Sequence, residues 1–189
     1  MTAREKLIKT QDVYDHSGTS EIFLEAMRDC LKHHSENNDF FCKYLKESGF
    51  SPDDIKTEDD LKKIPVIHAN FFKKYEVLSV DREDIVFYAT SSGTSGQKSQ
   101  MFFDKDTFDF GNTMIENEFR YFGFLSDELT NYLLFTYEPA EISKKLGTAQ
   151  TDLGLLSYAP VNDTFFALRY NGQGHDFDVY GTINALEEY

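Results

Sequence analysis

The chain has 189 residues, of which 40% are hydrophobic and 15% aromatic. This composition suits one sizeable packed domain, or part of a larger one, and excludes a predominantly disordered chain. The net charge of −14 argues against a nucleic-acid backbone or an anionic membrane surface as the main partner. A nucleotide remains a candidate ligand, because it needs only a local pocket rich in N–H groups or positive charge.

The N-terminus has no apolar segment of a secretory signal, and no apolar run has the length of a membrane span. These features predict a soluble cytoplasmic protein. Cys30 and Cys42 lack the spacing of a metal site. We expect both to be core thiols rather than a disulfide or a catalytic pair.

Helical patterns dominate the chain before residue 64. Residues 1–18 are polar, and after them apolar side chains recur at the spacing of one helix face. Two later segments begin with Ser or Thr followed by acidic residues, which is typical of a helix N-terminus. Helices are therefore expected at residues 21–31 and 39–47, and short ones beginning near residues 51 and 57.

Strand and helix patterns alternate after residue 84, which is typical of an α/β fold. Residues 85–89 and 101–103 are strand-like and would form a hairpin. Residues 104–123 have a helical pattern, followed by strands at 132–136 and 164–170 and a helix near residue 182. The core candidates of the 104–123 helix are Phe108, Met114, Ile115, Phe119 and Phe122.

A polar loop, residues 90–99, separates the two expected hairpin strands. Its glycines allow close backbone approach, its exposed N–H groups can form an anion-binding concavity, and its hydroxyls add donors. This composition predicts a phosphate site, and a flexible surface turn is the structural alternative. The candidate nucleotide-binding residues are Ser91, Ser92, Gly93, Thr94, Ser95, Gly96, Gln97, Lys98 and Ser99.

Several common catalytic motifs are excluded. The loop is not a Walker A motif, because Gln97 precedes Lys98 where that motif needs Gly. No G-x-G-x-x-G opens a helix, and no G-x-S-x-G nucleophile elbow occurs. Asp104 and Asp106 are weak metal-ligand candidates, since carboxylates at a helix start are the simpler interpretation.

The histidines indicate a functional site less clearly than the polar loop does. His33 and His34 are adjacent on a helix, so they point in different directions and cannot form a two-histidine metal face. His175 lies in a turn-rich segment and is a candidate for lining a pocket. No catalytic residue is assigned from these positions.

The segment Ser92-Gly93-Thr94-Ser95-Gly96 resembles the phosphate loop of acyl-adenylate-forming enzymes, whose pattern is Ser-Gly-Thr-Thr-Gly. Within that superfamily it resembles the LuxE-like acyl-protein synthetases and, more distantly, phenylacetate–CoA ligases. Lys98 stands where the wider superfamily has Pro, and Ser99 where it has Lys. Flanking residues follow the family's order; they are Leu61, Ile64-Pro65, Phe72-Lys73, Leu78-Ser79, Asp104 and Thr107.

The resemblance implies an α/β fold with a helical N-terminal region at residues 1–84. An adenylating subdomain, part of a mixed sheet with flanking helices, would follow at residues 85–189. It also implies that the loop holds the β- and γ-phosphates of ATP, with Mg²⁺ sharing the charge. A fatty or other carboxylate would be activated as acyl-AMP for transfer to a thiol.

The family's later elements are not found in these 189 residues. They are an acidic and aromatic nucleotide motif, a ribose-binding Asp, a catalytic Lys and an acyl-accepting Cys. We therefore expect the N-terminal part of such a ligase, inactive alone, with a complementary chain or self-association. The alternatives are a non-catalytic module that keeps the fold without the chemistry, and an unrelated α/β protein whose loop binds no nucleotide.

Overall fold

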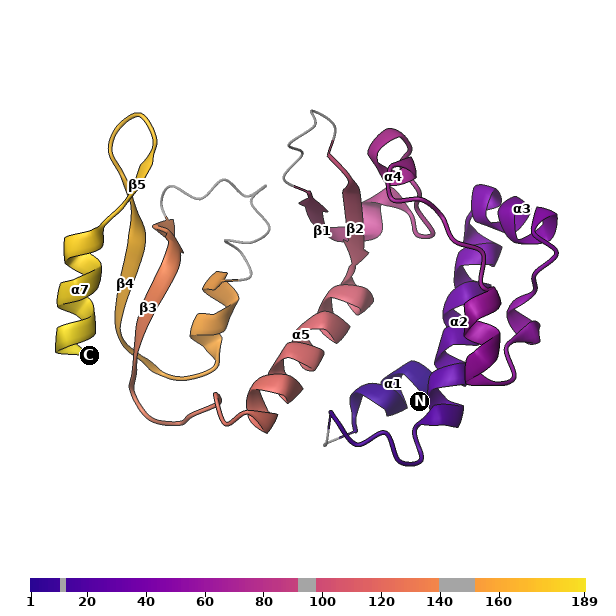
Figure 1. The fold of residues 1–189 in the computed structure, drawn as a ribbon, viewed down its shortest axis with the longest axis horizontal. Coiled ribbons are helices and arrows are strands. Elements are labelled where there is room, and N and C mark those ends of the chain that lie inside the picture. The colour runs from indigo at the N-terminus through magenta and orange to yellow at the C-terminus, as the bar shows by residue number, and fades with distance from the viewer. Residues whose placement is uncertain (11–12, 92–97, 140–151) are drawn as a thin grey trace. The chain divides into compact units, whose positions relative to one another are not determined.

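The computed structural model describes residues 1–10, 13–91, 98–139 and 152–189 (Figure 1). The chain divides into two compact units, residues 1–118 and 119–189. Helices occupy most of the N-terminal region, and the sheets that follow have flanking helices, so the chain has the expected α/β fold. The domain division at residue 85 stays a prediction.

Helices build the first part of the first unit, and their packing creates its core. Leu24 and Leu31 lie on the longest helix and pack with Ile55, whose side chain is fully buried. Phe41, Phe50, Leu61 and Ile64 pack against this cluster. The helical elements are α1 (Ala3–Ile8), α2 (Ser20–Asn37), α3 (Asp39–Glu47), η1 (Pro52–Asp54), η2 (Glu58–Lys63), α4 (Phe71–Lys74) and η3 (Arg82–Asp84).

Helix α1 was not expected, because the segment is short and polar. A capping box forms it: the Thr2 hydroxyl accepts from the Glu5 N–H, and the Glu5 carboxylate accepts from the Thr2 N–H. Contacts from distant sequence then hold it in place. The Arg4 guanidinium lies 4.4 Å from the centroid of the Phe110 ring, and the Asn117 side chain donates to the Ile8 carbonyl at 2.7 Å.

The predicted hairpin is confirmed, with β1 (Ile85–Thr90) antiparallel to β2 (Gln100–Asp104). Helix α5 (Lys105–Tyr121) follows at once, and the Asp104 carboxylate accepts from the Thr107 N–H in its first turn. On one face of the hairpin the Phe87 ring packs on Phe103 and on Phe108, with centroid separations of 5.6 and 5.3 Å.

The expected core stripe of α5 is wrong for three of its members. Met114 is exposed, and Phe108 lies at the edge of exposure. Phe122, which follows the end of α5 at Tyr121, is exposed as well, and no residue of α5 is buried. Ile115 and Phe119 are half-buried. The physical reason is the small size of the described partners of α5 in its unit, a two-stranded hairpin and the short α1, which cover only part of a helix circumference.

The second unit contains a mixed three-stranded sheet in the order β3-β4-β5. Strand β3 (Thr130–Tyr137) is parallel to β4 (Val161–Tyr170), and β5 (His175–Phe177) returns antiparallel to β4. The two longer strands and the helix α7 (Val179–Glu188) were expected. Strand β5 was not, because its three residues are too few for a pattern; a short η5 (Leu155–Ser157) precedes β4.

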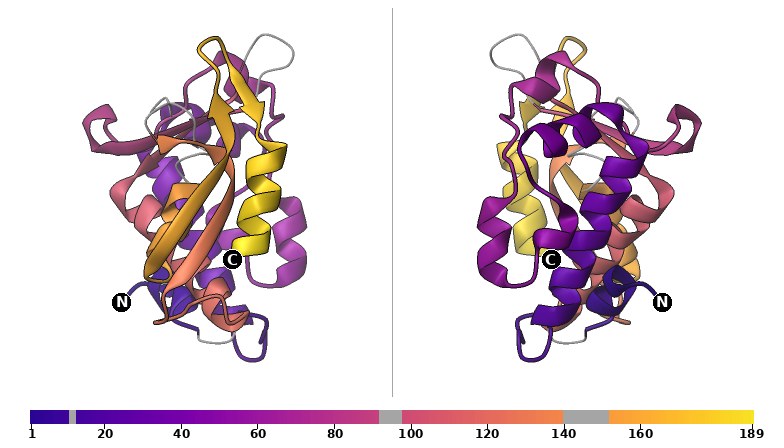
Figure 2. Two further views of the ribbon diagram at one scale, coloured as in Figure 1. Left: turned by 90° about the vertical axis from the view of Figure 1, so that its left-hand side faces the viewer. Right: turned by 90° about the vertical axis from the view of Figure 1, so that its right-hand side faces the viewer.

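Helix α7 contacts β3 and β4 (Figure 2). Ala167 is fully buried on β4, and Thr182 and Ala185 are buried on α7. The Asp178 carboxylate caps the helix by accepting from the Gly181 N–H at 2.8 Å. A Cβ at Gly181 would collide with the Asp178 carboxylate and lie 2.6 Å from the Phe165 ring, so a close approach explains this glycine. No helix within the described residues is long and apolar enough to cross a membrane.

Candidate phosphate loop and adjoining pocket

The base of the predicted phosphate loop is closed by a pair of hydrogen bonds. The strand ladder ends at the pair Thr90 and Gln100, and Ser91 and Ser99 continue it. The Ser91 N–H donates to the Ser99 carbonyl at 3.1 Å, and the Ser99 N–H donates to the Ser91 hydroxyl oxygen at 2.9 Å. The hairpin therefore fixes both ends of the loop at the end of two paired strands.

The predicted nucleotide-binding residues divide into two groups. Ser91 and Ser99 are half-buried at the loop base, and Lys98 is exposed beside them. Ser92, Gly93, Thr94, Ser95, Gly96 and Gln97 lie outside the described residues. Nucleotide binding by all nine therefore stays a prediction, with the loop base as its described part.

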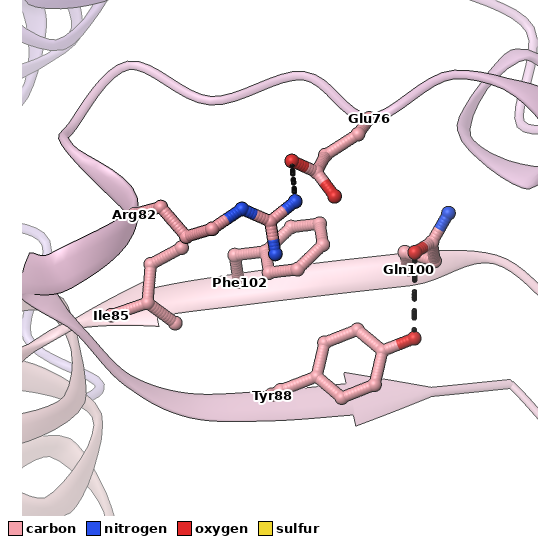
Figure 3. A pocket seen from close by; sticks show the side chains of 6 residues that line it. All are labelled: Glu76, Arg82, Ile85, Tyr88, Gln100 and Phe102. Carbon is pink, nitrogen blue, oxygen red and sulfur yellow. Dashed lines mark hydrogen bonds and ion pairs between the residues drawn. The ribbon is translucent and has the colours of Figure 1, made fainter.

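A pocket of about 330 Å³ adjoins the hairpin (Figure 3). The register places its residues Tyr88 and Phe102 on the strand face opposite Phe87 and Phe103. The segment that precedes β1 and the two strands together supply its lining residues, which are Glu76, Arg82, Ile85, Tyr88, Gln100 and Phe102. Sequence reasoning missed this pocket. Gln100 and Phe102 have the two-residue spacing of one strand face, but their pairing with Tyr88 becomes visible only once the register is known.

The segment before the hairpin is anchored to the helical part by the Leu78-Ser79 pair. The Asn38 side chain donates to the Leu78 carbonyl at 2.7 Å. The His34 Nδ1 and the Ser79 hydroxyl oxygen are 2.8 Å apart. Burial, followed by the positive charges of His33 and Arg4, lowers the pKa of His34 below its usual value. Leu78 and Ser79 thus position the chain that leads into β1.

The other candidate residues are not gathered into one site. The His33 and His34 rings lie edge to face with centroids 5.4 Å apart. Asp104 caps α5; burial raises the pKa of its carboxyl, but the hydrogen bonds from Thr107 and the charge of Arg4 outweigh it and lower the pKa. Asp106 is exposed on the first turn of the same helix.

No cluster of three or more His, Cys, Asp or Glu side chains that could hold a metal occurs among the described residues. That observation is compatible with Mg²⁺, which proteins usually bind through one or two side chains together with substrate phosphates. Cys30 and Cys42 are free but only half-buried, so the expected place in the core is not reached by either of them. Burial raises the pKa of the Cys30 thiol, which disfavours the nucleophilic thiolate.

His175 lies in the second unit, on β5. Its ring centroid is 4.5 Å from that of Tyr137 and 5.3 Å from that of Tyr170. Its Nε2 is buried, with no hydrogen-bond partner among the described residues. The pocket described above lies in the first unit and does not include it.

A helical N-terminal region that leads into a hairpin with a Ser-, Thr- and Gly-rich loop is consistent with the acyl-adenylate-forming class. Residues 6–129 match the family described as acyl-protein synthetase, LuxE, and the chain belongs to this family. It is also 34% identical over 77 residues to a phenylacetate-coenzyme A ligase of Pseudomonas putida. That similarity covers 39% of this chain and 18% of the relative, so the chain spans less than a fifth of the relative's length.

Proposed function

We propose that this chain is the phosphate-binding part of an ATP-dependent ligase that activates a fatty or other carboxylate as acyl-AMP for transfer to a thiol. The family match carries the proposal, because it includes the whole hairpin and its loop. The two hydrogen bonds between Ser91 and Ser99 support it further, since they hold both ends of the loop together. A cytoplasmic location, and assembly with a complementary chain or a second copy, belong to the same proposal.

The chemistry needs stabilisation of charge on a transferring phosphoryl group. A carboxylate oxygen attacks the α-phosphorus of ATP, and a new oxygen–phosphorus bond forms. The bond from the α-phosphorus to the oxygen that bridges to the β-phosphate breaks, and pyrophosphate leaves with that electron pair. Preorganised donors stabilise such charge best. The loop N–H groups and hydroxyls would supply them, with Lys98 adding a positive charge.

Mg²⁺, when bound, would neutralise charge on the phosphate oxygens. Hydroxyls of the loop are the candidates to share its coordination with the nucleotide.

Equilibrium binding of Mg-ATP tests the loop. We expect saturable binding in calorimetric titration of this chain, and loss of that binding in Gly93→Trp, whose side chain would fill the phosphate site. Gly154→Trp is the matched control, because Gly154 is an exposed glycine with open space around it. Equal ATP binding by the wild type and Gly93→Trp would refute the role of the loop.

Release of pyrophosphate separates a ligase from a non-catalytic module. After addition of a carboxylate and a complementary chain, the ligase predicts carboxylate-dependent pyrophosphate release that Gly93→Trp abolishes. A non-catalytic module predicts ATP binding without release. We expect this chain alone to release none.

A further inference from the structure

The pocket beside the loop has an aromatic floor. Tyr88 and Phe102 face each other across the two strands, with ring centroids 5.0 Å apart, and Ile85 extends the apolar surface (Figure 3). On the other face, Phe87 packs on Phe103 and supplies the aromatic contact with Phe108 of α5. The floor therefore belongs to the face of the hairpin that α5 does not cover.

Polar groups line the rim of this pocket. The Arg82 guanidinium donates to the Glu76 carboxylate, and the segment between these residues runs along the face that carries Phe102 (Figure 3). Gln100 lies beside the floor, with its Oε1 3.5 Å from the Tyr88 hydroxyl oxygen. The pocket thus offers a cation and an amide at the edge of an apolar surface.

The carboxylate now paired with Arg82 is exchangeable. The Arg82 side chain is 68% exposed and that of Glu76 is 32% exposed, and an exposed ion pair of this kind contributes little net stability. A guanidinium presents five N–H donors that match the two oxygens of any carboxylate. A ligand carboxylate can therefore replace that of Glu76 at little cost, while its apolar part covers Tyr88 and Phe102.

We propose that this pocket binds the carboxylate substrate, an organic acid with a compact apolar body such as one ring or a short chain. Arg82 would hold the carboxylate, and Tyr88 and Phe102 would contact the body. The volume of about 330 Å³ is near the lower end of the roughly 300–1,000 Å³ of small-molecule sites, which favours a compact body over a long fatty chain.

The pocket and the loop belong to the same hairpin. Gln100 follows Ser99 directly, so one hairpin carries both the loop base and the pocket. A carboxylate that attacks a phosphate must approach the residues that hold that phosphate. The inference therefore rests on the proposed function, and it adds a substrate class and Arg82 as the residue that recognises it.

Direct titration with four probes tests the pocket, in the absence of ATP. The probes are 3-phenylpropionate, hexanoate, tetradecanoate and inorganic phosphate. We expect saturable binding of the two compact acids, weaker binding of tetradecanoate, and none of phosphate. Tighter binding of phosphate than of the acids would indicate a simple anion site and overturn the proposal, as would preferential binding of tetradecanoate.

Two substitutions at the rim of the pocket should change the Kd of 3-phenylpropionate in opposite directions. Arg82→Gln removes charge-assisted hydrogen bonds and should raise the Kd of 3-phenylpropionate about tenfold or more. Glu76→Gln removes the competing carboxylate and should lower that Kd about twofold to fivefold. The Lys105–Asp109 ion pair on α5 is exposed too. Lys105→Gln and Asp109→Asn are therefore matched controls, and neither should change the Kd of 3-phenylpropionate.

Unchanged binding in Arg82→Gln, or weaker binding in Glu76→Gln, would overturn the proposal. Circular dichroism of each variant confirms that it is folded.

The Gly93→Trp variant distinguishes this proposal from the function on which it rests. We expect this variant to lose ATP binding and to retain carboxylate binding. Wild-type ATP binding without carboxylate binding would refute the pocket alone.

Discussion

Single residues at the loop base show how far residue type alone can predict a role. Ser91 and Ser99 were expected to contact a nucleotide because hydroxyls are common at phosphate sites. In the structure the Ser91 hydroxyl oxygen accepts from the Ser99 N–H, so this side chain also shapes the loop. Nucleotide binding by these residues stays a prediction, and the partner of each described side chain follows only from the strand register.

The pH dependence of stability should reveal the lowered pKa of His34. Its pKa is lowered in the folded chain, so the unfolded chain takes up a proton more readily. The free energy of unfolding should therefore fall as the pH drops below the unfolded-state value of about 6.5. His34→Gln should flatten this dependence in urea titrations between about pH 7 and pH 5.

His16→Gln is the control for that measurement, because His16 precedes α2, whereas the His34 ring contacts Ser79 and Phe41. An equal flattening in both variants would contradict a specific role of His34. NMR titration of the imidazole signals gives the pKa directly. A His34 pKa above that of a model histidine would contradict desolvation as the main influence on this group.

Secondary-structure elements were predicted well where apolar periodicity is long. Both strands of the hairpin, α2, α3, α5, β3, β4 and α7 occur where the sequence placed them. Helix α1 was missed although Thr2 and Glu5 have the spacing of a capping box, a signal that could have found it. The pocket was missed because Arg82 and Glu76 belong to a segment without periodicity, and only tertiary packing places them beside Tyr88.

Substitution of Gly181 tests how closely α7 packs on its neighbours. Gly181→Ala would push a methyl group against the Asp178 cap and Phe165, and it should destabilise the chain by about 1–3 kcal/mol. Gly111→Ala in α5 is the matched control, since no atom lies within 4 Å of its added Cβ. That control should instead stabilise by about 0.5–1 kcal/mol through helix propensity. Urea unfolding measures both; a stabilising Gly181→Ala would contradict the close approach.

At the scale of the whole molecule, strong negative charge coexists with exposed apolar side chains. Val179, Ile183 and Leu186 share one face of α7 and are exposed, as is the neighbouring Tyr180. The net charge of −14 makes two copies repel each other. Charge and apolar surface therefore oppose each other in any association of this chain with itself.

Self-association should increase with salt. The Debye length falls from about 10 Å at 0.1 M to about 3 Å at 1 M, so salt removes the repulsion and leaves the apolar attraction. Sedimentation equilibrium should show a rising mean mass, and Leu186→Glu should suppress it. Leu129→Glu adds the same charge at another exposed leucine outside α7 and serves as the control. Equal suppression by both variants, or a mass independent of salt, would contradict association through α7.

The contacts between α1 and α5 also have a consequence for the order in which the chain folds. The Asn117 side chain bonds to a carbonyl 109 residues earlier in the chain. During synthesis, α1 therefore leaves the ribosome long before α5 exists. Six residues are too few for a stable isolated helix, so α1 must first pack on α2, the neighbouring helix that it contacts. The contacts of α1 with Phe110 and Asn117 can form only after α5 has emerged, so the N-terminus becomes fixed in two stages, first on α2 and later on α5.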